Sequence, residues 1–203
     1  MPKLLANPRL TLIGTALISA SACSQPAPLT KGDWKLDNAA SSLSFVTVKA
    51  RNVGEAHAFK ALEGSVSPDG KAELVVDLAS VDTGIEIRDQ RMREVLFDVG
   101  AYPKANVTAQ IDPAVFANLA VGDSVTQDTT ATLDLYGATS EVNATVRVVR
   151  TGADTVLVTT TRPIVLDAGG LGLADGVEQL RELAGLPAIS HAVPVSFAIT
   201  FRR

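Results

Sequence analysis

The strongest structural signal in this sequence is the stretch Val195-Ser196-Phe197-Ala198-Ile199-Thr200-Phe201, in which large apolar side chains alternate with small or polar ones. A period of two is typical of a β-strand with one apolar and one polar face. The same period recurs upstream, at Leu74, Val76 and Leu78, at Leu133 and Leu135, and at Val142, Ala144, Val146 and Val148. The pattern predicts an all-β fold in which each strand turns one apolar face to a common interior.

Further segments between turn signals complete the set of predicted strands. They are Trp34–Asp37, Leu43–Lys49, His57–Val66, Val107–Ile111 and Thr155–Thr161, with turns such as Ser67-Pro68-Asp69-Gly70 and Tyr136-Gly137. The total of about eight or nine strands is near the number at which an antiparallel sheet closes into a barrel. A two-sheet sandwich is the competing architecture, because periodicity alone does not distinguish the two.

Composition supports one domain with an unusual interior. The chain has 203 residues, of which 46% are hydrophobic and only 4% aromatic, so one well-buried core fits and a second full domain would be cramped. Strands built from Val, Ala, Leu and Thr leave interior volume that Phe or Trp would fill. Such a composition is compatible with a hollow barrel, but by itself it favours a packed core of small residues.

Helical signals are few and short. Two are predicted at Ile87–Phe97, which could also be an ordered loop, and at Pro113–Leu119, after the capping residue Asp112. The clearest is Asp175–Ala184, where Asp175 is placed to cap, Glu178 follows at the third position and Gly185 would end the helix. We expect these helices to cover a β body.

The N-terminus has the three parts of an export signal. A basic segment with Lys3 and Arg9 precedes an apolar run from Leu10 to Ile18 and small residues up to Ala22. Ala20-Ser21-Ala22-Cys23 resembles the lipobox of bacterial lipoproteins, although Ala20 replaces the usual Leu and an ordinary signal peptidase could cleave the same bond. Because Cys23 is the only cysteine, lipidation would remove an exposed thiol that has no intramolecular partner.

These features divide the chain into three regions. Residues 1–22 are predicted to be a signal peptide, residues 23–33 a lipidated tether with Pro26 and Pro28, and residues 34–203 the β domain. Removal of the signal peptide moves the formal net charge from −4 to −6, because two basic residues leave and no acidic one does. An acidic domain of this kind argues against nucleic acid as a partner. We expect an exported protein on the periplasmic side of a bacterial membrane, or a soluble periplasmic or secreted one if Cys23 is not lipidated.

A combination of short motifs gives the domain a family likeness. They are Trp34-Lys35-Leu36-Asp37, Ser41-Ser42-Leu43-Ser44-Phe45, Leu62-Glu63-Gly64, Val76-Asp77-Leu78-Ala79-Ser80-Val81-Asp82-Thr83-Gly84, Arg88-Asp89, Met92-Arg93, Phe97-Asp98-Val99 and Tyr102-Pro103. Together they resemble the YceI-like family of polyisoprenoid-binding proteins over residues 34 to 111, and more weakly through Ala131–Val149. The segment from Leu166 to Pro194, with its glycines and helix, departs from the family.

The resemblance implies a lipocalin-like antiparallel barrel whose apolar interior holds a long isoprenoid tail, such as a polyprenyl or quinone chain. Candidate cavity residues are Phe45, Val76, Leu78, Phe97, Leu133, Leu135 and Phe197. Arg88, Asp89 and Arg93 are candidates for a polar gate at the barrel mouth that meets a head group, for a solvated charged face, or for contacts that hold a loop to the barrel wall.

The residues offer little for catalysis or metal binding. Val81-Asp82-Thr83-Gly84 matches an aspartic-protease motif, but it is a single copy inside the family likeness. His57 and His191 lie on separate predicted segments with only Glu55 near either in sequence, so we expect structural or surface roles and no metal site. We predict a protein that is not an enzyme and needs no cofactor.

The sequence thus predicts a membrane-tethered protein that carries or sequesters an isoprenoid lipid. The alternative is a periplasmic stress-response or protein-interaction module with no physiological lipid. The oligomeric state is open, a dimer included.

Overall fold

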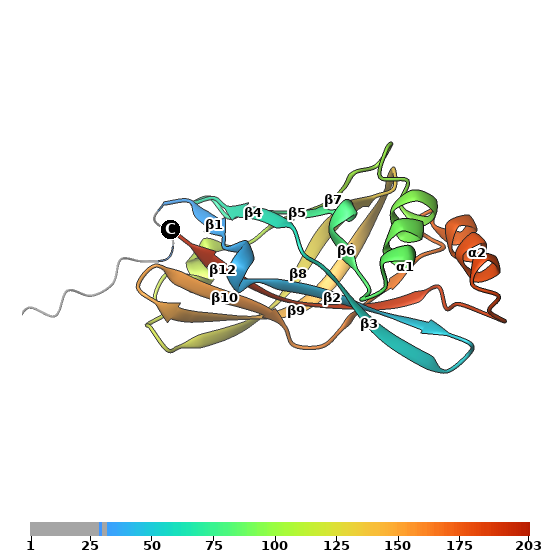
Figure 1. Ribbon diagram of the computed structural model, residues 1–203. Helices are drawn as coiled ribbons and strands as arrows, with labels where there is room; N and C mark the ends of the chain where they lie inside the picture. The colour runs from blue at the N-terminus through green and yellow to red at the C-terminus, as the bar shows by residue number, and fades with distance from the viewer. Residues whose placement is uncertain (1–28, 30–31) are drawn as a thin grey trace, which may run out of the picture.

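The protein is a single β-barrel with helices at one end, as Figure 1 shows for the computed structural model. The structure describes Leu29 and residues 32–203, so the predicted signal peptide and Cys23 lie outside the described residues. The strand segments are β1 Trp34–Leu36, β2 Ser42–Lys49, β3 Val53–Phe59, β4 Leu62–Val66, β5 Lys71–Asp77, β6 Val81–Asp82, β7 Lys104–Gln110, β8 Ser124–Leu135, β9 Ala138–Gly152, β10 Thr155–Thr160, β11 Ile164–Asp167 and β12 Ala192–Arg202.

These segments form eight long strands in an up-and-down order. Four long strands are each made of two successive segments, namely β1 with β2, β3 with β4, β5 with β6, and β10 with β11. Every neighbouring pair is antiparallel, and β12 closes the ring by pairing with β10 and β11 on one side and with β1 and β2 on the other. The predicted barrel is therefore confirmed and the sandwich is not what forms.

The predicted continuous strand His57–Val66 is wrong, because the chain leaves the sheet at Lys60 and Ala61. Two polar side chains form hydrogen bonds with backbone groups of residues 60–62. The Asn38 side chain donates to the Lys60 carbonyl at 3.0 Å and accepts from the Leu62 amide at 2.8 Å. The Ser80 hydroxyl accepts from the amides of Lys60 and Ala61 at 3.1 and 3.0 Å. Side-chain hydrogen bonds thus replace the ladder at the bend.

The helices lie together at one end of the barrel (Figure 1). α1 (Glu86–Arg91) continues into a π-helical turn, η3 (Met92–Leu96), and both connect β6 to β7, whereas α2 (Ala174–Leu183) connects β11 to β12. Gly176 lets α2 approach η3 closely, because a Cβ atom on it would lie 3.1 Å from the Leu96 Cα atom. The predicted cap at Asp175 is wrong, since Leu173 precedes the first turn without a side-chain cap, but Gly185 ends the helix with φ +63° as expected.

The opposite end of the barrel is filled by a second, smaller cluster of apolar side chains. Trp34 and Phe116 are its large members, and the Trp34 indole N–H donates to the Leu29 carbonyl at 2.9 Å. Phe116 belongs to a short 3₁₀ turn, η4 (Pro113–Phe116), which the Asp112 side chain caps as predicted. Figure 1 places the C-terminus at this end, away from α1 and α2.

The predicted turn at Tyr136-Gly137 is confirmed, and it joins β8 to β9. Both residues have positive φ, +54° and +75°, which matches the two-residue hairpin turn that suits the twist of the flanking strands.

No helix in the described part of the chain is long and apolar enough to cross a membrane.

Candidate functional site

A cavity of about 600 Å³ runs inside the barrel and is the candidate site. Its lining begins at Lys49 and Arg88 beside the helices and extends to Ile111, Phe116 and Phe201 near the opposite end. This volume lies in the range of about 300–1,000 Å³ that is typical of pockets for small molecules. The cavity is therefore a tunnel along the barrel axis, and both clusters of core side chains contribute to its wall.

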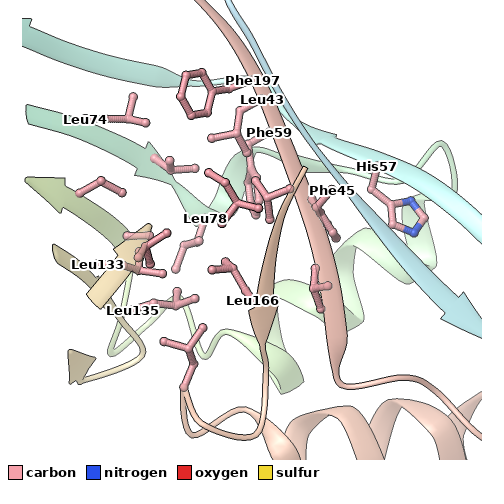
Figure 2. A pocket seen from close by; sticks show the side chains of 18 of the residues that line it. Leu43, Phe45, His57, Phe59, Leu74, Leu78, Leu133, Leu135, Leu166 and Phe197 are labelled. Carbon is pink, nitrogen blue, oxygen red and sulfur yellow. The ribbon is translucent and has the colours of Figure 1, made fainter. Parts of the chain in front are cut away.

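Alternation along the strands makes the wall apolar. On β8, Thr129, Ala131, Leu133 and Leu135 line the tunnel, while the residues between them are exposed. All seven predicted cavity residues lie in the lining, namely Phe45, Val76, Leu78, Phe97, Leu133, Leu135 and Phe197. Figure 2 shows several of them converging on the same apolar space. Their contact with a ligand stays a prediction.

Small side chains keep this space open. The alanines in the lining are Ala72, Ala105, Ala109, Ala131, Ala144, Ala168 and Ala184. At these positions the wall carries one methyl group where a Leu or Phe would project into the tunnel. The low aromatic content of the sequence thus belongs to a hollow barrel rather than to a packed core of small residues.

The inner face of β2 and β3 changes from apolar to polar toward the hairpin that joins them. Phe45 lies opposite His57 in the strand register, and Thr47 lies opposite Glu55. All four line the tunnel, as does Lys49. The period-two positions that are apolar in the middle of the barrel therefore carry a hydroxyl, a carboxylate, an imidazole and an ammonium group beside the helices.

Arg88 of α1 extends this polar cluster. One terminal nitrogen of its guanidinium donates to the Glu55 carboxylate at 2.7 Å, and the other donates to the Thr83 carbonyl at 2.7 Å. The Lys49 ammonium contacts the same Glu55 oxygen at 2.8 Å. The hydrogen bond from Lys49, helped by the charge of Arg88, lowers the pKa of Glu55. Glu55 is therefore ionised at neutral pH and fixes both cations at the tunnel wall.

The other two gate candidates have different surroundings. Asp89 is buried, and it accepts hydrogen bonds from the amide and the hydroxyl of Thr83, the amide bond measuring 2.8 Å. Arg93 pairs with the exposed Glu86 at 2.8 Å. Among the described residues, Arg88 is the member of this predicted trio that lines the tunnel. Asp89 and Arg93 instead hold the α1 segment in place.

His57 is the most enclosed polar side chain of the cluster, with 4% of its surface exposed. Its Nε2 atom lies 2.8 Å from the Thr47 hydroxyl, and its ring contacts Phe45 with the centroids 5.2 Å apart (Figure 2). Burial, helped by the positive charge of Arg88, lowers the pKa of His57. The imidazole is therefore neutral at pH 7.

Two atoms of this cluster are buried without a hydrogen-bond partner among the described residues. They are His57 Nδ1 and Arg88 Nε. Buried polar atoms are rarely left unpaired in native proteins, because desolvation without a replacement hydrogen bond is costly. Both atoms belong to residues that line the tunnel.

The tunnel reaches solvent beside the helices. The exposed members of its lining are Ile85, Ile87 and Ala184, which lie at the start of α1 and at the end of α2. Ile85 is 48% exposed and Ile87 is 54% exposed, although both are large apolar side chains. The mouth of the tunnel is therefore at the helical end.

The cluster lacks the arrangement that nucleophilic catalysis requires. Thr47 and His57 form a hydroxyl–imidazole pair, but in the described part of the chain no acid orients the imidazole through Nδ1.

Asp82 of the protease-like motif pairs with Lys60 at 2.7 Å and accepts from the Gly84 amide. Across Leu29 and residues 32–203 no group of His, Cys, Asp and Glu residues could hold a metal ion.

We expected His57 to be structural or at the surface, and the structure buries it in the tunnel wall beside Thr47. Thr47 and Lys49, which also line the tunnel, were not among the predicted site residues. The signal that could have found them is their position in the alternation. Phe45, Thr47 and Lys49 are alternate residues of β2, so their side chains point to the same face of the sheet. Because Phe45 faces the interior, the period of two predicts that Thr47 and Lys49 also face it. Glu55 and His57 do the same on the neighbouring strand.

Comparison with known proteins agrees with this architecture. Residues 34–201 match the family described as the YceI-like domain. A polyisoprenoid-binding domain from Saccharophagus degradans, implicated in plant cell wall breakdown, is 41% identical, with a TM-score of 0.81 over 83% of this chain and 97% of that chain. No match was found among curated proteins.

More distant structures share the fold alone. BcnA of Burkholderia cenocepacia is 22% identical, with a TM-score of 0.62 over 81% of this chain and 98% of that chain. The YceI protein of Campylobacter jejuni is 13% identical, with a TM-score of 0.52 over 72% of this chain and 84% of that chain. Because the family match covers most of the sequence and a structure with 41% identity covers the same domain, this chain belongs to the YceI-like family.

Proposed function

We propose that the protein binds a long apolar isoprenoid-type lipid, a polyprenyl or quinone tail, inside the barrel. The observation that carries this proposal is the continuous apolar tunnel, which spans both core clusters and opens at one end. Burial of apolar surface contributes about 25 cal/mol per Å², so a long branched hydrocarbon gains affinity from every part of such a wall. A compact polar metabolite would leave most of the wall without contacts.

The relative from Saccharophagus degradans supports the same ligand class. That protein is described as a polyisoprenoid-binding domain, and it aligns over nearly its whole length at 41% identity. We infer a binding role rather than an enzymatic one, because the polar lining residues of the tunnel, apart from Glu73 and Thr129, lie at its mouth, where they can contact the head of a ligand.

A matched pair of variants tests the proposal. Ala131→Phe places an aromatic ring in the tunnel from β8, whereas Thr132→Phe places the same ring on the exposed face one residue further along. We expect Ala131→Phe to lose at least about 90% of the isoprenoid that solvent extraction recovers from the purified wild-type protein, because the tail and the ring occupy the same volume. Thr132→Phe should retain the wild-type amount.

Two outcomes would contradict the proposal. The first is equal lipid recovery from both variants, with melting temperatures showing that both are folded. The second is a wild-type protein that contains no lipid, takes up none from isoprenoid-containing vesicles, and captures a protein partner instead. That result would favour the interaction module.

We further propose that the protein is exported and held at the periplasmic side of a membrane through lipidated Cys23, as a carrier or sequestering protein. The support is the sequence of residues 1–23, with its basic, apolar and small-residue parts before the only cysteine. The several acyl chains of a mature lipoprotein cysteine anchor stably, whereas a single chain would not.

Replacement of the cysteine tests the tether. In cells that produce Cys23→Ser, the protein should move from the membrane fraction to the soluble periplasmic fraction, with its extracted lipid per mole of protein unchanged. Ser24→Ala is the matched control and should stay with the membrane. Persistence of Cys23→Ser in the membrane fraction would contradict the tether.

A further inference from the structure

The polar cluster at the mouth contains two buried nitrogen atoms that have no hydrogen-bond partner within Leu29 and residues 32–203. We propose that His57 Nδ1 and Arg88 Nε together bind one neutral oxygen atom, a hydroxyl or a carbonyl, on the head of the lipid whose tail fills the tunnel. The inference rests on the proposed function and adds to it the residues and the chemistry that recognise the head group.

The surrounding contacts fix both side chains and leave these atoms available. The two terminal nitrogens of Arg88 are engaged by Glu55 and by the Thr83 carbonyl, both at 2.7 Å, so Nε is the part of the guanidinium without a partner. The Nε2 atom of His57 is engaged by Thr47 at 2.8 Å, so Nδ1 is the part of the imidazole without one. A site whose groups are held in this way loses little conformational freedom when a ligand binds.

The chemistry of the two atoms selects the ligand atom. Arg88 Nε–H is a donor only. The neutral imidazole can offer either a donor or an acceptor at Nδ1, because the Thr47 hydroxyl can donate to Nε2 or accept from it. A carbonyl oxygen accepts from both nitrogens. A hydroxyl accepts from Arg88 and donates to His57.

The mouth carries a net positive charge, because Lys49, Arg88 and Arg91 outnumber Glu55 among the charged lining residues beside the helices, but the position of Glu55 disfavours a phosphate at Arg88 Nε. The Glu55 carboxylate neutralises Arg88 by direct contact and is ionised, because Lys49 and Arg88 both stabilise its charge. A phosphate within reach of Arg88 Nε would lie beside this fixed negative charge, and the two terminal nitrogens that bind phosphate best are occupied. One neutral oxygen can form hydrogen bonds with both His57 Nδ1 and Arg88 Nε without electrostatic repulsion from the Glu55 carboxylate.

Three isoprenoid probes of equal length separate the head from the tail. They are geranylgeraniol with a hydroxyl, geranylgeranyl monophosphate with an anion, and phytane with no oxygen, each measured by displacement of an apolar fluorescent dye. The wild-type protein should bind the alcohol about tenfold or more tightly than phytane, since a hydrogen bond from a charged group is worth at least this factor. The phosphate should bind no better than the alcohol.

Two variants test the assigned atoms. His57→Phe keeps a ring beside Phe45 and removes both nitrogens, and Arg88→Lys keeps a cation for Glu55 and removes Nε. Each should lower the affinity for the alcohol by about tenfold while leaving that for phytane within about twofold. Arg93→Lys is the matched control, because Arg93 pairs with Glu86 at the same end, and it should bind all three probes as the wild type does.

The failures are distinguishable. Equal wild-type affinity for the alcohol and phytane overturns the head-group site and leaves the tail-binding function standing, and this comparison needs no variant to fold. A phosphate that binds tenfold more tightly than the alcohol overturns the neutral head. If the wild type binds none of the probes, the proposed function itself fails.

Discussion

Both ends of this barrel bury side chains that form strong hydrogen bonds. The two ends differ in whether the described residues supply partners for all of these buried groups. At the end with the C-terminus, the guanidinium of Arg150 donates to the carbonyls of Leu119, Gly152 and Ala153 at 2.7 to 3.3 Å. At the helical end, His57 and Arg88 each keep a buried nitrogen without a partner in the described residues. The first end is therefore held together by its own backbone carbonyls, whereas the second has the unpaired polar atoms that the proposed head-group site requires.

The largest effect should come from disrupting the end with the C-terminus. Arg150→Ala would leave the carbonyls of two loops without a donor and open a cavity, because Arg150 is only 3% exposed. We expect the free energy of unfolding to fall by about 3 kcal/mol or more, measured by denaturant titration. Arg147→Ala, at an exposed position of the same strand, is the control and should change it by less than about 0.5 kcal/mol. Equal effects of the two variants would show that Arg150 does not hold this end together.

A smaller effect is expected where the helices meet over the mouth. Gly176→Val would place side-chain carbons against the backbone of Val95 and Leu96, where even a Cβ atom would approach to 3.1 Å. We expect a loss of about 1–3 kcal/mol in the free energy of unfolding, typical of overpacking. Gln179→Val, on the exposed face of α2, introduces the same side chain without the clash. An unchanged free energy of unfolding in Gly176→Val would mean that α2 can move away from η3 without destabilising the protein.

The smallest effect concerns pH and belongs to the mouth. The pKa of His57 is lowered by burial, so the unfolded chain binds a proton at higher pH than the folded protein does. The stability contributed by the neutral imidazole is therefore complete above the unfolded value of about 6.5 and is lost as the pH falls below it, by at most about 1.4 kcal/mol per pH unit. In His57→Phe this part of the pH dependence should disappear. Parallel curves for the two proteins between pH 7 and pH 5 would contradict the assignment.

Much of the barrel could be predicted because its strands obey a simple period. Val195–Phe201 and the inward residues of β8 alternate without interruption, and hydrophobic burial on one face leaves a single register for such strands. The break at Lys60 and Ala61 could not be predicted in the same way. It depends on Asn38 and Ser80, which lie 22 and 20 residues away from Lys60 in the sequence.

The apolar lining of the tunnel could be predicted from the sequence, whereas most of the polar cluster at its mouth could not. The seven predicted cavity residues lie in the tunnel wall. The five on strands face the interior of the closed barrel because of their period of two, whereas Leu78 and Phe97 lie in the connections that follow β5 and η3. His57 was not predicted as a site residue, because Glu55 is the only potential ligand near it in the sequence. The surroundings of His57 depend on the strand register, which places Thr47 and Glu55 beside it, and on α1, which carries Arg88.

Native mass spectrometry of the domain purified without detergent, followed by organic extraction, tests whether the tunnel binds an isoprenoid. We expect a protein with a non-covalent adduct in the mass range of a polyisoprenoid, which extraction releases and identifies as an isoprenoid with a neutral oxygen-containing head. The adduct should be retained in Thr132→Phe and absent in Ala131→Phe. A folded wild-type domain that shows only the mass of its polypeptide, even after incubation with isoprenoid-containing vesicles, would show that the tunnel does not bind an isoprenoid.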